Sequence, residues 1–133
     1  MNATRLTAQD FMITSIVTFS PDTEMMDALH ELVSKEISGA PVLDERGNLV
    51  GLLTERDCLG TVLTAGYHGE AAGRVAEYMS RDVVSVDADA SLMDIAERFS
   101  QTPYRRFPVM KNSRLVGLIS RRDVLRAVMS LAG

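Results

Sequence analysis

The sequence has few of the residues on which covalent or metal chemistry depends. It holds one cysteine, Cys58, and two histidines, His30 and His68, with no second Cys or His at metal-ligand spacing. A single cysteine cannot form an internal disulfide, and isolated histidines do not make a metal site. Walker loops, Gly-x-Ser-x-Gly motifs and zinc motifs are also missing. We therefore predict a protein that is not an enzyme and needs no metal.

Long apolar runs are missing as well. The longest run near the N-terminus, FMITSIVTF at residues 11–19, is short, contains Thr and Ser, and has neither the basic region nor the cleavage site of a secretory signal. We predict neither a membrane span nor a signal peptide, and a cytoplasmic location.

Aromatic residues are scarce, at 5 % with no tryptophan, and the net charge is −4. Nucleic-acid-binding proteins usually combine basic faces with aromatic stacking, so RNA or DNA is a weak candidate ligand. The charge is uneven. Residues 1–73 hold 4 Lys and Arg against 11 Asp and Glu, whereas residues 74–133 hold 10 against 7. An anion site is therefore expected in the second half.

The chain contains an internal duplication. Residues 11–45 match residues 78–112 at an offset of 67, and after a one-residue deletion the match continues at an offset of 66. The matching positions include Met12 and Met79, Pro41-Val42 and Pro108-Val109, Val50-Gly51-Leu52 and Val116-Gly117-Leu118, and Arg56-Asp57 and Arg122-Asp123.

Each copy has the same predicted order of elements. An extended β-branched segment (15–19, 82–86) precedes a helix of about three turns. In copy two, Ser91 and Asp94 are expected to form a capping box at the start of this helix. Two strands joined by a turn and a final helix follow. The fold class is therefore α/β (α+β), with two β-α-β-β-α repeats. The predicted divisions are residues 1–10 as an arm or short helix, 11–66 as repeat 1, 67–74 as a linker and 75–133 as repeat 2.

Prolines and turn residues add two local expectations. Proline has no amide hydrogen, so we expect Pro41 and Pro108 at the start of their strands rather than within them. In the turn between the strands of copy one, Gly47 and Asn48 are expected to supply positive φ angles.

The stretches VGLLTERDCL (50–59) and VGLISRRDVL (116–125) repeat one polar pattern at the end of a strand. Thr54 and Asp57 in copy one, and Ser120 and Asp123 in copy two, have the spacing of helix caps. The same geometry suits a nucleotide, because unpaired helix amides bind phosphate and a carboxylate accepts ribose hydroxyls. Both interpretations remain open.

The repeat, with its hydrophobic-Pro-Val strand and Val-Gly-hydrophobic-hydrophobic-Thr/Ser-x-x-Asp stretch, resembles the CBS domain, named for cystathionine β-synthase. Two copies resemble a CBS pair, or Bateman module, over about residues 11–132. The resemblance implies a pseudo-twofold pair whose inter-repeat clefts bind adenosine-containing ligands such as AMP, ADP, ATP or S-adenosylmethionine. It also implies a homodimer formed through the helices.

By position, the resemblance gives the ribose-binding role to Asp57 and Asp123. In a relative, the AMP-activated kinase γ subunit, basic residues at the positions of Arg105 and Arg106 reach the ligand phosphate. Surface charge is the alternative for these arginines. We predict two sites. The favoured site comprises Thr14, Ile16, Ser38, Gly39, Ala40, Arg105, Arg106, Ser120 and Asp123; the second, without equivalent arginines, comprises Thr54, Asp57, Arg81, Val83 and Phe107.

Two functions follow as hypotheses. The first is a regulatory sensor that binds an adenine nucleotide and signals to an unidentified partner protein, because a ligand that prefers one state of a protein shifts its population. The second is a scaffold for oligomerisation whose sites hold no ligand.

Overall fold

The computed structural model describes residues 6–68 and 73–132, which form two compact units. Unit 2 is continuous and spans Val17–Val83. Unit 1 is discontinuous and combines Met1–Ile16 with Val84–Gly133. Residues 1–5 and 69–72, which cover half of the predicted arm and half of the predicted linker, lie outside the described part.

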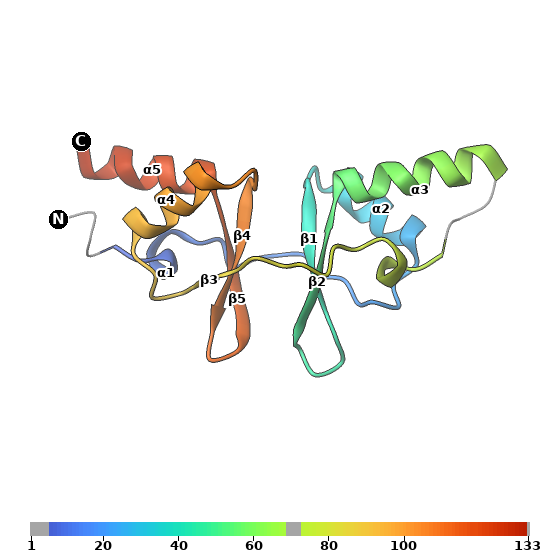
Figure 1. Ribbon diagram of the computed structural model, residues 1–133, viewed down its shortest axis with the longest axis horizontal. Coiled ribbons are helices and arrows are strands. Elements are labelled where there is room, and N and C mark those ends of the chain that lie inside the picture. Colours follow the sequence, from blue (N-terminus) through green and yellow to red (C-terminus); the bar gives the residue numbers. More distant parts are fainter. Residues whose placement is uncertain (1–5, 69–72, 133) are drawn as a thin grey trace. The chain divides into compact units, whose positions relative to one another are not determined.

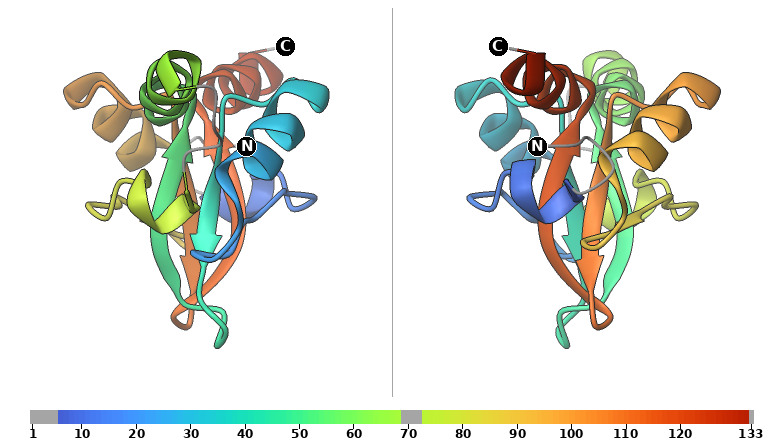
Figure 2. Two further views of the ribbon diagram at one scale, coloured as in Figure 1. Left: turned by 90° about the vertical axis from the view of Figure 1, so that its right-hand side faces the viewer. Right: turned by 90° about the vertical axis from the view of Figure 1, so that its left-hand side faces the viewer.

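Unit 2 has an α-helix before and after an antiparallel hairpin. Helix α2 (Met25–Ser34) precedes strands β1 (Gly39–Leu43) and β2 (Leu49–Thr54), and α3 (Glu55–His68) follows without a break. The short helix η2 (Val75–Glu77) also belongs to this unit. Both long helices lie toward the end of the hairpin opposite its turn (Figures 1 and 2).

Unit 1 repeats this arrangement with a third strand. The order is α1 (Ala8–Phe11), β3 (Val86–Asp87), α4 (Leu92–Gln101), β4 (Arg106–Lys111), β5 (Arg114–Ser120) and α5 (Arg121–Ala132) (Figure 1). Strand β4 pairs in parallel with β3 and antiparallel with β5. The predicted α/β class and the repeated helix-hairpin-helix order are confirmed.

The leading segment of each repeat packs with the other repeat's hairpin. Ile13 and Leu118 exchange backbone hydrogen bonds at 2.8 and 2.9 Å, and Ser80 and Leu52 exchange an equivalent pair at 2.9 Å. The close approach needs glycine in the strand. A Cβ atom on Gly117 would lie 2.8 Å from the Ile13 carbonyl oxygen. The repeated Met lies on the leading segment and the repeated Val-Gly pair lies on the hairpin strand. The two repeated motifs therefore belong to the same contact in each unit.

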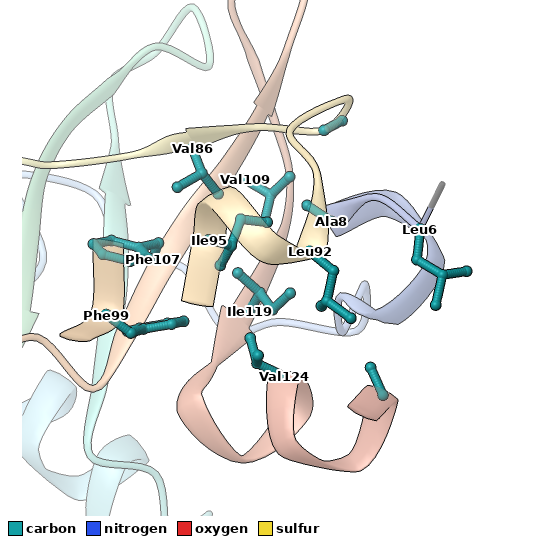
Figure 3. Packing of buried hydrophobic residues seen from close by; sticks show 12 residues of the cluster. Leu6, Ala8, Val86, Leu92, Ile95, Phe99, Phe107, Val109, Ile119 and Val124 are labelled. Atoms are coloured by element: carbon teal, nitrogen blue, oxygen red, sulfur yellow. The ribbon is translucent and has the colours of Figure 1, made fainter. Parts of the chain in front are cut away.

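Each unit has its own hydrophobic core. In unit 1, side chains from α1, α4, the strands and α5 converge (Figure 3), and Phe99 and Phe107 stack with ring centroids 4.4 Å apart. In unit 2, Leu32 and Ala40 take the positions of those two rings, whereas Phe19 takes the position of Val86. The two cores therefore place their aromatic side chains at different points of the same framework.

Both prolines lie within their strands, so the expectation that they begin them was wrong. Pro41 is opposite Leu52 and Pro108 is opposite Leu118 in the register. The amides and carbonyls of Leu52 and Leu118 bond to Ser80 and Ile13 instead, on the far side of the hairpin. In an antiparallel pair, a residue whose amide and carbonyl point away from the partner strand makes no hydrogen bond to the residue opposite. The missing amide of Pro41 or Pro108 therefore removes no hydrogen bond to Leu52 or Leu118.

The hairpin turn of copy one uses one of the two predicted residues as expected. Gly47 has a φ of 83°, but Asn48 is not among the residues with positive φ. Instead the Asn48 amide and side chain donate to the Asp44 carboxylate at 2.8 and 3.0 Å. These hydrogen bonds, led by the backbone one, lower the pKa of Asp44. In copy two, Asn112 and Ser113 adopt positive φ.

The extended segments that begin each repeat form less sheet than the sequence predicts. Only Val86–Asp87 forms a strand in copy two, and in copy one Phe19 forms an isolated bridge to Val42. The expected cap of α4 is present, since Ser91 Oγ accepts from the Asp94 amide at 3.1 Å. Within the described ranges, no helix is long and apolar enough to cross a bilayer.

One buried hydroxyl predicts a stabilising substitution. Thr61 on α3 is fully buried, and its Oγ1 has no hydrogen-bond partner among the described residues, whereas the matching residue of unit 1 is Ala127. Thr61→Val keeps the shape and removes the unsatisfied group, so the free energy of unfolding should rise by about 1 kcal/mol. Urea denaturation measures it. The same change at Thr54, whose hydroxyl is bonded, should lower stability by about 1 kcal/mol, and equal effects at the two positions would contradict the assignment.

Candidate functional site

The same polar corner lies at the strand-to-helix junction of both units. In unit 2, the Thr54 amide and hydroxyl donate to Asp57 Oδ2 at 2.9 and 3.0 Å, and the Asp57 amide donates to Thr54 Oγ1 at 3.3 Å. In unit 1, the Ser120 amide donates to Asp123 Oδ2 at 2.8 Å and the Asp123 amide donates to Ser120 Oγ at 3.1 Å. The capping interpretation is therefore confirmed in both copies.

Another hydrogen bond fixes the first amide of each helix. The Glu55 amide donates to the Ser38 carbonyl at 2.9 Å, and the Arg121 amide donates to the Arg105 carbonyl at 3.1 Å. The first and third amides of both helices are thus already bonded. The sequence expectation that unpaired amides bind a phosphate here is weakened, and charged side chains become the main candidates for that role.

In unit 1, most of the favoured residues lie on segments that neighbour the corner. Arg106 pairs directly with Ser120 across β4 and β5, and Arg105 is exposed immediately before that strand. Thr14 follows Ile13, which bonds to Leu118 two residues before Ser120. Ile16 is the last residue of the same leading segment. A carboxylate, a hydroxyl and two guanidinium groups therefore come from neighbouring segments of one unit.

In unit 2, the corresponding corner has a different charge. Gly39 pairs with Thr54, so a residue without a side chain takes the place of Arg106. A Cβ on Gly39 would lie 2.8 Å from the Leu53 carbonyl oxygen, and Ala40 is buried in the core. An arginine is nevertheless present. Arg81 follows Ser80 on the leading segment and donates to the Ala76 carbonyl at 3.3 Å.

The predicted sets divide between the units. Of the favoured set, Ser38, Gly39 and Ala40 belong to unit 2, and the other members belong to unit 1. Of the second set, Phe107 belongs to unit 1, where it has no exposed area and stacks on Phe99. Phe107 can support the walls of a site but presents no surface to a ligand. The remaining members, Thr54, Asp57, Arg81 and Val83, belong to unit 2.

The two carboxylates differ in their surroundings. Asp123 is 5 % exposed, and its Oδ1 accepts a hydrogen bond from the Arg126 guanidinium at 3.4 Å. Asp57 is half-buried. A carboxylate oxygen has two lone pairs, so both groups retain the capacity to accept ligand hydroxyls in addition to the capping bonds. The arrangement suits recognition of a polyol next to an anion.

Cys58 follows Asp57 on α3 and is buried. Burial, with smaller contributions from the charges of Asp57 and Glu55, raises the pKa of its thiol. A thiol with a raised pKa is a poor nucleophile at neutral pH. The apolar role that the sequence suggests for Cys58 is consistent with this environment.

Sequence reasoning gave too little weight to Arg81. The sequence places Arg81 in the second site, but as a neighbour of the adenine and not as a counterpart of Arg105 and Arg106. The signal was available in the duplication, because Arg81 occupies the position of Thr14. Each unit therefore has an arginine on a segment next to its hairpin, and in unit 2 the guanidinium donates to the Ala76 carbonyl.

Comparisons with known proteins agree with this duplicated α/β module. The CBS domain family model matches residues 8–64 and 75–130. The chain therefore belongs to the CBS domain family and carries two CBS domains.

Individual relatives share the pair. The CBS domain-containing protein YhcV of Bacillus subtilis is 31 % identical over 122 residues, which cover 92 % of this chain and 85 % of YhcV. An uncharacterised protein of Methanocaldococcus jannaschii, MJ1225, is 27 % identical over 122 residues, but the chain spans only 42 % of its length. The crystal structure of CBSX2 in complex with AMP matches with a TM-score of 0.83 and 28 % identity, covering 96 % of this chain and 98 % of that one.

Proposed function

We propose that this protein is a regulatory module that binds an adenosine-containing ligand, with AMP, ADP or ATP preferred and S-adenosylmethionine as an alternative, and passes the bound state to a partner protein. The observation that carries the proposal is the duplicated Thr/Ser-x-x-Asp corner, with Arg106 paired to Ser120 in unit 1. The likeness to CBSX2, solved with AMP, supports the adenosine class. The module is proposed to be non-catalytic, cytoplasmic and a homodimer.

Thermal melting of the whole chain with AMP, ADP, ATP, NADH and S-adenosylmethionine tests the proposal. A ligand at 100 times its dissociation constant should stabilise the folded state by roughly 2.7 kcal/mol, which is a shift of several degrees for a chain of this size. If none of the ligands shifts the melting temperature, nucleotide sensing is contradicted. The result would then favour an oligomerisation scaffold. Leu59 on α3 and Leu125 on α5 are exposed apolar side chains, which suit a surface for association.

The phosphate contact has its own prediction. Arg106→Ala should weaken AMP binding by about 10- to 100-fold, because a charge-assisted hydrogen bond is lost, and should leave adenosine binding almost unchanged. Isothermal calorimetry with both ligands measures this. Arg114→Ala, at the turn end of the same strand pair, is the matched control. Equal losses for AMP and adenosine, or no loss for AMP, would contradict the assignment.

A further inference from the structure

The chain between α4 and β4, residues 102–105, has no regular secondary structure and carries Arg105 (Figure 1). Arg121, the first residue of α5, holds this segment at neighbouring points. The Arg121 amide donates to the Arg105 carbonyl at 3.1 Å, and the Arg121 Nε donates to the Tyr104 carbonyl at 2.8 Å. A single residue of the helix therefore fixes successive carbonyl groups of the 102–105 segment.

The matching segment of unit 2, residues 35–38, is held by its own helix instead. Glu36 has a φ of 54°, and its amide donates to the Val33 carbonyl at 3.2 Å. The Ile37 amide donates to the Leu32 carbonyl at 3.0 Å. This is a Schellman motif, in which a residue in the left-handed conformation lets the end of a helix close on its last turn. The end of α2 is therefore closed by backbone groups of the same helix.

Unit 1 cannot close α4 in this way, because Pro103 takes the place of Glu36. The proline ring fixes φ at about −65° and leaves no amide hydrogen, so neither the left-handed conformation nor the hydrogen bond of Glu36 is possible there. Helix α4 ends at Thr102, which is extended with a φ of −132° and whose hydroxyl donates to the Arg98 carbonyl at 2.9 Å. Beyond Thr102, the segment needs contacts with other elements, and the Arg121 side chain supplies one of them.

The bond from the Arg121 side chain has no equivalent in unit 2, because Glu55 takes the place of Arg121. The Glu55 amide donates to the Ser38 carbonyl at 2.9 Å, as the Arg121 amide does to that of Arg105. An ionised carboxylate, however, only accepts hydrogen bonds and cannot hold a second carbonyl. Ser38 in turn takes the place of Arg105. The arginine that holds the segment and the arginine that the segment carries therefore occur together, in the same unit.

Tyr104 links this segment to the core of unit 1. Its ring is edge-on to the fully buried ring of Phe107, with centroids 6.0 Å apart, and its carbonyl accepts the bond from Arg121. The residue before Arg105 is thus held through both its side chain and its backbone. Ordering a segment costs conformational entropy, and a segment that is ordered before a ligand arrives leaves less of this cost to the binding step.

We propose that Arg121 is a positioning residue for phosphate binding in unit 1. Its side chain holds the Tyr104 carbonyl, this contact orders the 102–105 segment, and the ordered segment presents the Arg105 guanidinium to the phosphate of an adenine nucleotide. Arg121 itself does not touch the ligand. The inference rests on the proposed function. It adds a residue that lies between Ser120 and Asp123, where the repeated Thr/Ser-x-x-Asp pattern specifies nothing.

Substitutions of similar length separate the hydrogen bond of Arg121 from its charge. Arg121→Gln places an amide nitrogen at the same point of the side chain as Nε and removes the charge, whereas Arg121→Met removes both donor and charge. Arg121→Met should weaken AMP binding about 5- to 10-fold because one hydrogen bond is lost, and Arg121→Gln should remain within about twofold of the unchanged chain. Adenosine affinity should change with neither. Isothermal calorimetry with both ligands measures this.

Arg122→Met is the matched control, because Arg122 is the next residue of α5 and is also exposed. Removal of an exposed charge alone should change AMP affinity by less than about twofold. Equal weakening by Arg121→Gln and Arg121→Met would show that Arg121 acts through its charge, and would overturn the proposal. An Arg121→Met chain that binds AMP as tightly as the unchanged chain, or no more weakly than the Arg122→Met chain, would overturn it as well.

A double-mutant cycle with Arg105 shows whether Arg121 acts through it. In an Arg105→Ala background, Arg121→Met should weaken AMP binding by less than about twofold, because residues that act as one unit have non-additive effects. A loss as large as in the unchanged background would mean that Arg121 binds the ligand independently of Arg105. The positioning role would then be wrong.

Backbone ¹⁵N relaxation without ligand tests the ordering step alone. Arg121→Met should lower the order parameters of Thr102, Tyr104 and Arg105, and Arg121→Gln should restore them. Residues 35–38 of unit 2 are the internal control, because their helix closes without an arginine side chain, and their order parameters should stay the same. Order parameters that are unchanged by Arg121→Met would overturn the proposal.

The calorimetry and the relaxation data together distinguish the possible failures. If no nucleotide binds to the unchanged chain, the proposed function fails together with the phosphate role, and the relaxation data alone decide whether Arg121 orders the segment. If AMP binds but Arg121→Met alters neither its affinity nor the order parameters, the inference about Arg121 fails and the proposed function stands.

Discussion

Replacing Asp123 by alanine should weaken adenine-nucleotide binding by about 100-fold or more. The Asp123 carboxylate is placed at the start of α5 by the Ser120 amide and lies close to the Arg126 guanidinium. If it accepts both ribose hydroxyls, the variant loses two charge-assisted hydrogen bonds of about 1.5–3 kcal/mol each. Isothermal calorimetry with AMP measures the loss.

The control is Asp57→Ala, because the two acids cap their helices in the same way. Both variants should lose about 1 kcal/mol of stability with the cap, so a difference between them in nucleotide affinity reports on the ligand alone. We expect the larger loss with Asp123→Ala. If this variant binds AMP as tightly as the unchanged chain, Asp123 is only a helix cap.

Replacing Phe107 by alanine should have the largest effect on stability, a loss of about 3–5 kcal/mol. The ring has no exposed area and packs among Phe99, Tyr104 and the aliphatic core of unit 1 (Figure 3). Because domains of this size are stable by about 5–15 kcal/mol in total, unit 1 should unfold at much lower urea. Urea denaturation followed by circular dichroism measures the change.

Tyr104→Ala is the matched control for Phe107→Ala. Tyr104 belongs to the same aromatic cluster but is 37 % exposed, so its removal leaves less of a cavity and should cost clearly less. A stability loss below about 1 kcal/mol for Phe107→Ala would contradict the tight packing of the ring in this core. Only then would the second-site role that the sequence predicts for Phe107 be open again.

Features that depend on a few neighbouring residues could be predicted from the sequence. The Thr54–Asp57 and Ser120–Asp123 caps and the Ser91 cap involve residues three apart, and the structure contains all of them. The order of helices and strands was likewise predictable, because the duplication gives the same pattern twice and each copy supports the other.

Features that depend on distant residues could not be predicted in this way. Pro41 and Pro108 tolerate mid-strand positions because Ser80 and Ile13, far away in the sequence, take the hydrogen bonds of the facing residues. Phe107 is buried in a core that also contains Ala8 and Val124, from elements well separated from it in the sequence. Local patterns contain no information about these partners.

The exchange of leading segments has a consequence for the order of folding. Unit 2 is continuous, whereas the Ile13–Leu118 contact of unit 1 joins segments on either side of the whole of unit 2. Forming that contact first would require closing a long disordered loop, and loop closure costs entropy that grows with the length of flexible chain. Once unit 2 has folded, less flexible chain remains between Ile13 and Leu118, so closing this contact costs less entropy. Unit 2 is therefore expected to fold first, and unit 1 to be completed after it, because the leading segment and the hairpin of unit 1 flank unit 2 in the sequence.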